Sequence, residues 1–182
     1  MKVIHFPLEV NYVNSFLCYD EDARDAFLVD CGAFEAQIED FVQKNDFNLK
    51  MLLLTHSHYD HIDGVKDFKR WINVPIYAST KKYDHRISEG DTIAFADSEI
   101  SVLATPGHTP DGVSFYLKPF VFVGDAIFAG AVGGTAGRKQ FQEEAQHVWN
   151  KILALPDDTI IYPGHGAPSM VGVERLYNPF FD

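Results

Sequence analysis

Four short apolar runs in this chain each end in residues of the kinds that bind metals. The run Met51–Leu54 leads into His56-Ser57-His58, and three later runs lead into Gly107-His108, Gly124-Asp125 and Gly164-His165. If these runs are strands that lie side by side, their ends converge on one edge of the sheets. Glycine beside each of the later ligand-type residues allows tight turns and close backbone approach. The pattern therefore predicts a rigid β-scaffold that carries one shared site.

The densest of these groups places three histidines and a carboxylate within the segment 56–61. In an extended His-x-His, both side chains leave the same side of the backbone, so His56 and His58 can hold one ion. If a helix follows, Asp60 and His61 project from its first turn, away from that pair. Four ligands in this arrangement suit two adjacent metals better than one. The alternative is a histidine-rich surface turn, because a bare motif always carries a risk of false matches.

The complete candidate set contains five imidazoles and two carboxylates, which are His56, His58, Asp60, His61, His108, Asp125 and His165. These residues divide into two groups of three with one shared carboxylate. His56, His58 and His108 would hold the first ion, and Asp60, His61 and His165 the second. Asp125 could bridge both ions, since a carboxylate has two oxygens.

The chemistry expected of two such ions is hydrolysis. A water or hydroxide between the cations would have a lowered pKa and would act as the nucleophile near neutral pH. The same ions would polarise a substrate carbonyl and stabilise the oxyanion that forms from it. Zinc is the expected metal, with iron or manganese as alternatives, because histidine and carboxylate ligands suit all three. The predicted reaction is cleavage of an ester-like bond.

Length and composition favour a globular protein. The chain has 182 residues, of which 46% are apolar, and it is expected to form a single domain over 1–182. No apolar run approaches the roughly 18 residues that a membrane helix needs. The first residues lack the features of a signal peptide. Cys18 and Cys31 are expected to be buried free thiols in a reducing compartment, which predicts a cytoplasmic protein.

The charge balance argues against nucleic acid as a partner. Lys and Arg total 15 against 26 Asp and Glu, which gives a net charge of −11. An acidic surface repels a phosphate backbone. The expected partner is a small molecule, with no nucleic acid and no membrane, and the sequence carries no signal for an oligomeric state.

Periodicity predicts the elements between these motifs. Strands are expected at Val3–Val13, Ser15–Tyr19, Ala26–Val29, Met51–Leu54, Pro75–Ala78, Thr92–Phe95, Glu99–Ala104, Val113–Leu117, Phe120–Val123 and Thr159–Tyr162. Amphipathic helices are expected after Gly32, over Asp63–Trp71 and over Phe141–Ile152. A glycine-rich loop is expected at Gly130–Gly134.

The motif His56-x-His58-x-Asp60-His61, followed in order by the other three candidates, resembles the ligand set of the metallo-β-lactamase superfamily. The branch that it resembles most is that of the glyoxalase II-like (hydroxyacylglutathione hydrolase-like) hydrolases. The resemblance runs from Asp30-Cys31-Gly32 to Asn178–Phe181. It implies an α+β fold, a four-layer αβ/βα sandwich with a dinuclear metal site at the edge of the two sheets. Asp125 argues against the β-lactamases proper, which usually lack this carboxylate.

Three features depart from the glyoxalase II pattern. Gly134 stands where those enzymes have a cation for the glutathione carboxylate, and Ala167 stands where they have a tyrosine. The chain also stops at Asp182, where those enzymes continue into a helical domain. The metal chemistry is therefore expected to carry over, whereas glutathione recognition is not. Arg138 or Lys139 could replace the cation, or both could be solvated residues before a helix.

The leading hypothesis is a dinuclear metal hydrolase of a thioester or related ester. Its catalytic residues would be Asp125, between the ions, and Asp60, which would accommodate the leaving group and the transferred proton. One alternative is a persulfide dioxygenase-like enzyme with one iron on His56, His108 and Asp125, and another is a non-catalytic metal-binding module. Asp30 could orient a metal-bound imidazole or could be only a turn residue. His5, His85 and His147 are not expected to be ligands, since none belongs to a spaced cluster.

Overall fold

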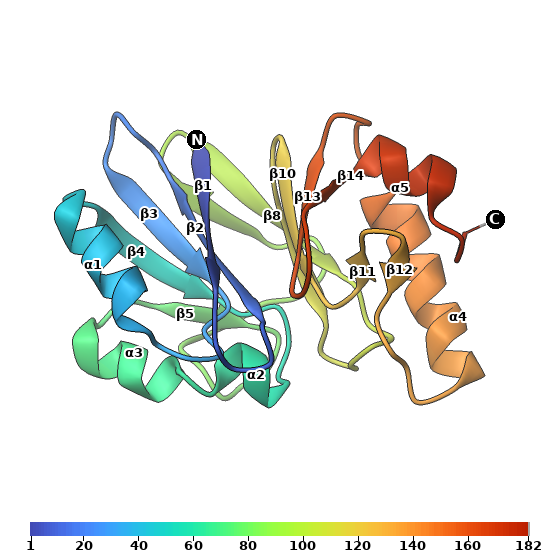
Figure 1. Ribbon diagram of the computed structural model, residues 1–182, viewed down its shortest axis with the longest axis horizontal. Helices are drawn as coiled ribbons and strands as arrows, with labels where there is room; N and C mark the ends of the chain where they lie inside the picture. The colour runs from blue at the N-terminus through green and yellow to red at the C-terminus, as the bar shows by residue number, and fades with distance from the viewer. Residues whose placement is uncertain (182) are drawn as a thin grey trace.

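A computed structural model describes residues 1–181 of the chain and shows four layers (Figure 1). Two six-stranded sheets pack face to face, with strand orders β1-β2-β3-β4-β5-β6 and β14-β13-β10-β9-β8-β7. Helices α1 and α3 cover the outer face of the first sheet, and α4 and α5 cover the second. This arrangement confirms the predicted α+β sandwich.

The strands are β1 Lys2–Pro7, β2 Asn14–Tyr19, β3 Asp25–Val29, β4 Asn48–Leu53, β5 Ile76–Ala78, β6 His85–Arg86, β7 Thr92–Phe95, β8 Ser98–Ala104, β9 Val113–Leu117, β10 Phe120–Gly124, β11 Ile127–Phe128, β12 Ala131–Val132, β13 Ile160–Pro163 and β14 Ser169–Met170. The helices are α1 Ala36–Lys44, α2 Tyr59–Ile62, α3 Val65–Trp71, α4 Arg138–His147 and α5 Val171–Tyr177, and α4 continues into the π-helical turn η1 Val148–Ile152. Strands β11 and β12 form a separate small hairpin.

Alternation along the central strands builds the layers. In β2, Phe16 and Cys18 face the second sheet, while Leu17 and Tyr19 face the covering helices. Because successive strand residues point to opposite faces, one buried strand supplies two separate apolar cores. A third core lies between the second sheet and the helices that follow β12. These three apolar layers hold the two sheets in place.

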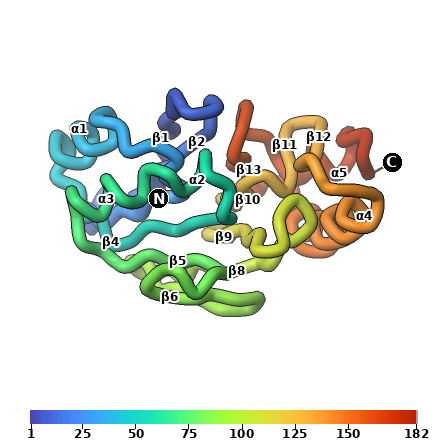
Figure 2. Tube along the Cα trace, turned by 90° about the horizontal axis from the view of Figure 1, so that it is seen from below, coloured from blue at the N-terminus to red at the C-terminus, as the bar shows by residue number. Residues whose placement is uncertain are grey.

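Parallel strands bring the ligand-type segments to one edge. Strands β3, β4 and β5 are parallel, with α1 and α3 as their crossovers, and β10 is parallel to β13. The residues that follow parallel strands emerge at the same end of a sheet. Figure 2 views this edge from below, with α2, β10 and β13 close together near its centre. The predicted convergence of the strand ends is therefore confirmed.

Two local predictions need correction, and one helix was not predicted. The expected strand Val3–Val13 ends at Pro7, because proline has no amide hydrogen to donate and the chain then turns through Asn11 and Tyr12, whose φ angles are 48° and 54°. The expected loop Gly130–Gly134 includes β12 of the small hairpin. Helix α5 did not follow from periodicity, since its seven residues are too few for a clear pattern.

Two further expectations can be compared with the structure. Cys18 and Cys31 are buried and are not disulfide-bonded, as predicted. No helix within residues 1–181 has the length and apolar character that crossing a membrane requires.

Candidate metal centre

Strand β4 delivers the histidine motif to the edge between the sheets. His56 follows the strand, and His58 remains extended (φ −62°, ψ 144°) before α2 begins at Tyr59. Asp60 and His61 lie in the first turn of α2 and are buried, as the motif predicted. The change from extended chain to helix therefore separates the pair His56 and His58 from the pair Asp60 and His61.

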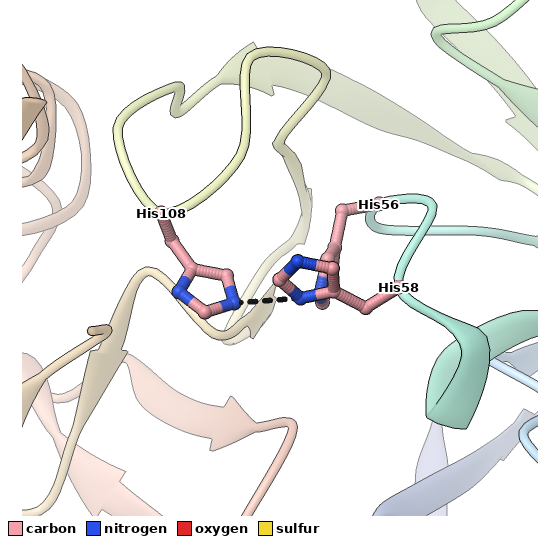
Figure 3. A group of neighbouring side chains, drawn as sticks. All are labelled: His56, His58 and His108. Carbon is pink, nitrogen blue, oxygen red and sulfur yellow. Dashed lines mark hydrogen bonds between the residues drawn. The ribbon is translucent and has the colours of Figure 1, made fainter. Parts of the chain in front are cut away.

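His56, His58 and His108 form the first group of candidate ligands, called the first ligand group below, and one nitrogen of each lies within 4.8 Å of the others. Nδ1 of His58 is 3.1 Å from Nε2 of His56 and 2.9 Å from Nε2 of His108 (Figure 3). Hydrogens on the outer nitrogens of His56 and His108 would leave lone pairs on both Nε2 atoms, facing His58. One imidazole hydrogen on His58 can satisfy only one of them. Three converging imidazole nitrogens are a typical metal-binding arrangement.

The outer nitrogens of the first group have acceptors. Nδ1 of His108 lies 2.6 Å from the Gly134 carbonyl, which can only accept a hydrogen bond. Nδ1 of His56 lies 3.1 Å from Oγ1 of Thr55, whose own hydrogen is donated to Asp30. Both rings are therefore held in the tautomer that points an Nε2 lone pair at the centre.

The second ligand group is formed by Asp60, His61 and His165, whose ligand atoms also lie within 4.8 Å of one another. Nε2 of His165 is 3.5 Å from Oδ2 of Asp60. Nδ1 of His61 donates to Oδ2 of Asp30 at 2.7 Å, which turns Nε2 of His61 toward the centre. This half of the site is buried more deeply, since His61 is fully inaccessible to solvent.

Asp125 lies between the two groups. Its Oδ2 is 3.5 Å from Nε2 of His108 in the first group and 3.6 Å from Nε2 of His165 in the second. Its Oδ1 is 3.3 Å from Nε2 of His61. The structure thus brings together all seven residues singled out in the sequence.

Two buried atoms at this point fit a bound cation. Nε2 of His61 and Oδ1 of Asp125 are inaccessible and make no accepted hydrogen bond within the described chain. Buried polar atoms ordinarily have partners. A metal ion bound between them would coordinate both atoms at once. Imidazole nitrogen and carboxylate oxygen are common metal ligands, so these residues fit a metal ion.

The pKa values in the site show the same preference for positive charge. Burial alone would lower the pKa of His61, but Asp30 and Asp125 outweigh it and raise the pKa to about 10. Burial raises the pKa of Asp125, but the neighbouring His61 and the other imidazole charges outweigh it and bring the pKa to about 2. Burial lowers the pKa of His56 to about 2, and the neighbouring His61 adds to this effect. Asp125 therefore stays ionised, and its negative charge together with that of Asp30 favours a positive charge beside His61.

Asp30 supports the deeper half of the site. Besides His61, it accepts hydrogen bonds from the Thr55 amide at 2.8 Å and from the Thr55 hydroxyl at 2.7 Å. Its φ of 56° lies in the left-handed region directly after β3. Of the two interpretations that the sequence left open for Asp30, the hydrogen bond to His61 supports the one in which it orients an imidazole.

Asn11 contacts the site although sequence reasoning did not identify it. Its side-chain amide donates to Oδ2 of Asp60 at 3.1 Å and lies 2.5 Å from the Tyr59 hydroxyl oxygen. The signal was hidden, because Asn11 lies in a run that periodicity assigned to a strand. The adjoining Val13 forms an isolated bridge with His165, which joins this turn to the second ligand group.

Helix α5 supports the hairpin that leads to Gly134. Glu174 is buried and accepts hydrogen bonds from the Gly130 amide at 2.9 Å and from the Asn178 side chain at 2.8 Å. Asn178 also donates to the Ala131 carbonyl at 3.1 Å. The two residues hold the hairpin β11–β12, three residues before the carbonyl that orients His108.

The residues discussed for substrate recognition lie at the surface. Gly134 is exposed, and an added Cβ there would meet no atom within 4 Å. Arg138 and Lys139 begin α4 and are exposed, and Ala167 is exposed beyond β13. His5, His85 and His147 belong to neither ligand group among the described residues.

Comparison with known proteins places this site in a family. Residues 8–165 match the metallo-beta-lactamase superfamily. A hydroxyacylglutathione hydrolase of Buchnera aphidicola is 35% identical over 163 residues, which cover 87% of this chain and 63% of that protein. Hydroxyacylglutathione hydrolase GloC of Haemophilus influenzae is 28% identical over 210 aligned positions, which cover 100% of this chain and 99% of that protein. The chain thus spans less than two thirds of one relative and nearly all of the other.

A solved structure gives the same result. The crystal structure of BLEG-1 B3 metallo-beta-lactamase superposes with a TM-score of 0.90, at 26% identity, over 99% of this chain and 99% of that one. The family match, the fold and the order of the seven residues agree, and the chain belongs to the metallo-beta-lactamase superfamily.

Proposed function

We propose that this protein is a metal-dependent hydrolase that binds two divalent ions and cleaves a thioester or a related ester. The observation that carries the proposal is that two separate ligand groups converge on one carboxylate, that of Asp125. His56, His58 and His108 would hold one ion, and Asp60, His61 and His165 the other. Zinc is the metal proposed, with iron and manganese as alternatives.

The chain's own residues would orient the reaction. When bound, the two ions would supply a water of lowered pKa and would polarise the substrate carbonyl. Asp125 would keep both ions at one carboxylate. Asp60 would accommodate the leaving group and take part in moving its proton. Asn11, which donates to Oδ2 of Asp60, would fix that carboxylate in the required orientation.

A single iron on His56, His108 and Asp125 has less support. That arrangement would leave Asp60, His61 and His165 gathered without an ion to bind, although their ligand atoms lie within 4.8 Å of one another. A non-catalytic module has less support too, because Thr55, Asp30 and the Gly134 carbonyl orient three of the imidazoles. Such outer hydrogen bonds usually tune a working metal.

The proposed substrate class follows from two sources. Both relatives named above are hydroxyacylglutathione hydrolases by name, which supports a thioester. Gly134 and Ala167 do not supply the side chains that the glyoxalase II pattern uses for glutathione, so we propose a smaller or differently charged thioester. The proposed compartment is the cytoplasm, where buried thiols such as Cys18 and Cys31 stay reduced.

The test combines metal analysis with a substrate panel. We expect about two metal ions per chain by elemental analysis, and hydrolysis of acetyl thioesters in preference to oxygen esters and β-lactams. One iron per chain would support the mononuclear alternative. Two ions with no activity on any member of the panel would support a non-catalytic module. Preferential β-lactam cleavage would replace the proposed substrate class, a result that the likeness to BLEG-1 makes worth testing.

A further inference from the structure

The positive charge of this acidic chain is concentrated in one segment. Residues 66–86 hold six of the 15 Lys and Arg residues but only two of the 26 Asp and Glu residues. The segment comprises most of α3, strand β5, the loop that follows it and strand β6, at one edge of the first sheet (Figure 2). A local positive potential on a protein of net charge −11 attracts anions to that place.

This basic segment borders the largest of the described cavities, of about 490 Å³. We call it the lysine pocket, and its lining residues are Ser57, Tyr59, Ile62, Asp63, Val65, Lys66, Lys69, Lys82 and Tyr83. The three lysines are exposed, so their ammonium groups can reach a ligand without a large desolvation cost. The tyrosine rings give the same ligand an apolar wall.

The charges in and around the lysine pocket do not cancel. Lys69 is 3.1 Å from Asp84, and Asp63 contributes a carboxylate to the lining. Lys66 adds a further ammonium group, and that of Lys82 lies 5.4 Å from the centre of the Tyr83 ring. The three lysines outnumber the two carboxylates of Asp63 and Asp84. The pocket is therefore positive, whereas the chain as a whole is strongly acidic.

The lysine pocket adjoins the candidate metal centre. Ser57 and Tyr59, which line it, are the residues on either side of His58. A smaller cavity is lined by Ser57 and Tyr83 together with His56. The two cavities therefore share a wall, and the second reaches a residue of the first ligand group. If the proposed function holds, a substrate with its carbonyl at the centre would extend past Ser57 toward Lys66 and Lys82.

The opposite side of the centre has a different character. A cavity of about 370 Å³ beside His108 is lined by Gln140, Glu143 and two prolines, among others. Glu143 would repel an anion there, and Gly134 supplies no cation. The two cavities thus differ in the charged residues that line them, lysines in one and a glutamate in the other.

We propose that the lysine pocket binds an anionic tail, a carboxylate or a phosphate, of the substrate that is cleaved at the metal centre. The inference rests on the proposed hydrolase function and narrows its substrate class. Lys66 and Lys82 would determine specificity, because they supply the excess positive charge.

The experiment compares acetyl thioesters whose thiol tails carry different charges. The thiols are N-acetylcysteamine (neutral), mercaptosuccinate (two carboxylates) and 2-mercaptoethyl phosphate. The double variant Lys66→Ala, Lys82→Ala is compared with Lys44→Ala, Lys118→Ala, which loses the same charge from exposed positions outside the pocket. We expect kcat/KM for an anionic thioester to fall about tenfold in the pocket variant, mainly through KM, and less at high salt. The neutral thioester should be unaffected.

The outcomes separate this inference from the proposed function. A preference of the natural protein for either anion, lost in the pocket variant alone, supports the lysine pocket. Equal losses for charged and neutral thioesters would overturn it, as would equal losses in both double variants. If no thioester is hydrolysed, the proposed function fails. The lysine pocket can then still be tested by calorimetry, which measures the binding of non-hydrolysable thioether analogues. Binding of the anionic analogue that depends on Lys66 and Lys82 supports the pocket, and equal binding by both proteins overturns it.

Discussion

Two buried carboxylates stand behind the candidate metal centre, and their surroundings differ. Asp30, behind His61, accepts three hydrogen bonds from His61 and Thr55. Glu144, on α4 behind His108, is fully buried, and neither of its oxygens has an accepted hydrogen bond within the described chain. Burial, with a further contribution from Asp125, raises the pKa of Glu144 to about 8, although the neighbouring His108 backbone amide opposes this.

The difference shows how the two halves of the site are held. On the Asp30 side, side-chain hydrogen bonds fix the ligand, so a mutation there acts directly on a ring. On the Glu144 side, close backbone packing holds the loop that carries His108. Gly107 lies so near α4 that an added Cβ there would be 2.2 Å from Cβ of Glu144. His108 takes its orientation from the Gly134 carbonyl. The deeper half should therefore be sensitive to side-chain mutation, and the outer half to changes in the loops.

The largest effect is expected from removing the residue that links the halves. Asp125→Ala should lose part or all of one ion and lower kcat/KM by about a hundredfold or more. Loss of a residue that only hydrogen-bonds to a metal ligand costs about 10–100-fold, and loss of a ligand shared by both ions should cost at least as much. Elemental analysis and steady-state kinetics check this, with the exposed Asp158→Ala as the control. Two ions and a near-normal rate in Asp125→Ala would contradict the bridging role.

The next effect concerns the deeper half alone. Asp30→Ala removes the acceptor for Nδ1 of His61, and we expect metal affinity to fall about 10–100-fold. Asp30→Asn keeps one acceptor oxygen and should lose less. Competition with a chromophoric chelator measures the affinity. Unchanged affinity in both variants would show that Asp30 serves only the turn.

A gain is expected on the outer half. Gly134→Arg places a cation where no atom lies within 4 Å of the added Cβ and leaves the Gly134 carbonyl in place. We expect the natural protein to hydrolyse S-lactoylglutathione with weak saturation. The variant should improve kcat/KM for that substrate about tenfold. Kinetics with a neutral thioester provide the control. Efficient, saturable use of the glutathione thioester by the natural protein would point to Arg138 or Lys139 as the cation.

The smallest effect on activity is expected from Glu144→Gln. This variant tests, through the pH dependence of stability, whether the buried carboxyl group of Glu144 is protonated. The folded pKa of about 8 exceeds the ordinary value of 4.5, so the folded state binds more protons between these values. The natural protein should therefore lose stability as pH rises through that range, by about 1.4 kcal/mol per pH unit relative to the variant. Urea unfolding of both proteins at several pH values measures this difference. A difference that does not change with pH would mean that Glu144 is ionised throughout.

The sequence predicted the parts of this molecule whose signals are local. A ligand at the end of an apolar run predicts both a strand and its place in the sheet, so His56, Asp125 and His165 were found together with their strands. Family resemblance supplied the order of the layers.

The remaining features depend on contacts that periodicity does not record. Asn11 reaches Asp60 because the first strand stops at Pro7 and the chain then turns through two left-handed residues. Glu144 looks like any polar residue of an amphipathic helix, yet the loops of Gly107 and Gly133 close over it. The basic character of residues 66–86 is visible in the sequence, but its position beside His58 follows only from the fold.

The support that Glu174 gives to the hairpin β11–β12 has a consequence for the order in which the protein matures on the ribosome. His56, His58 and Asp60 are synthesised early, and β4 can place them once the first sheet has formed. The hairpin that precedes Gly134 is held by residues translated more than 40 positions after it. A nascent chain shorter than 174 residues therefore lacks the group that secures the Gly130 amide. The hairpin before the Gly134 carbonyl, which orients His108, is therefore secured only after Glu174 and Asn178 have been added to the chain.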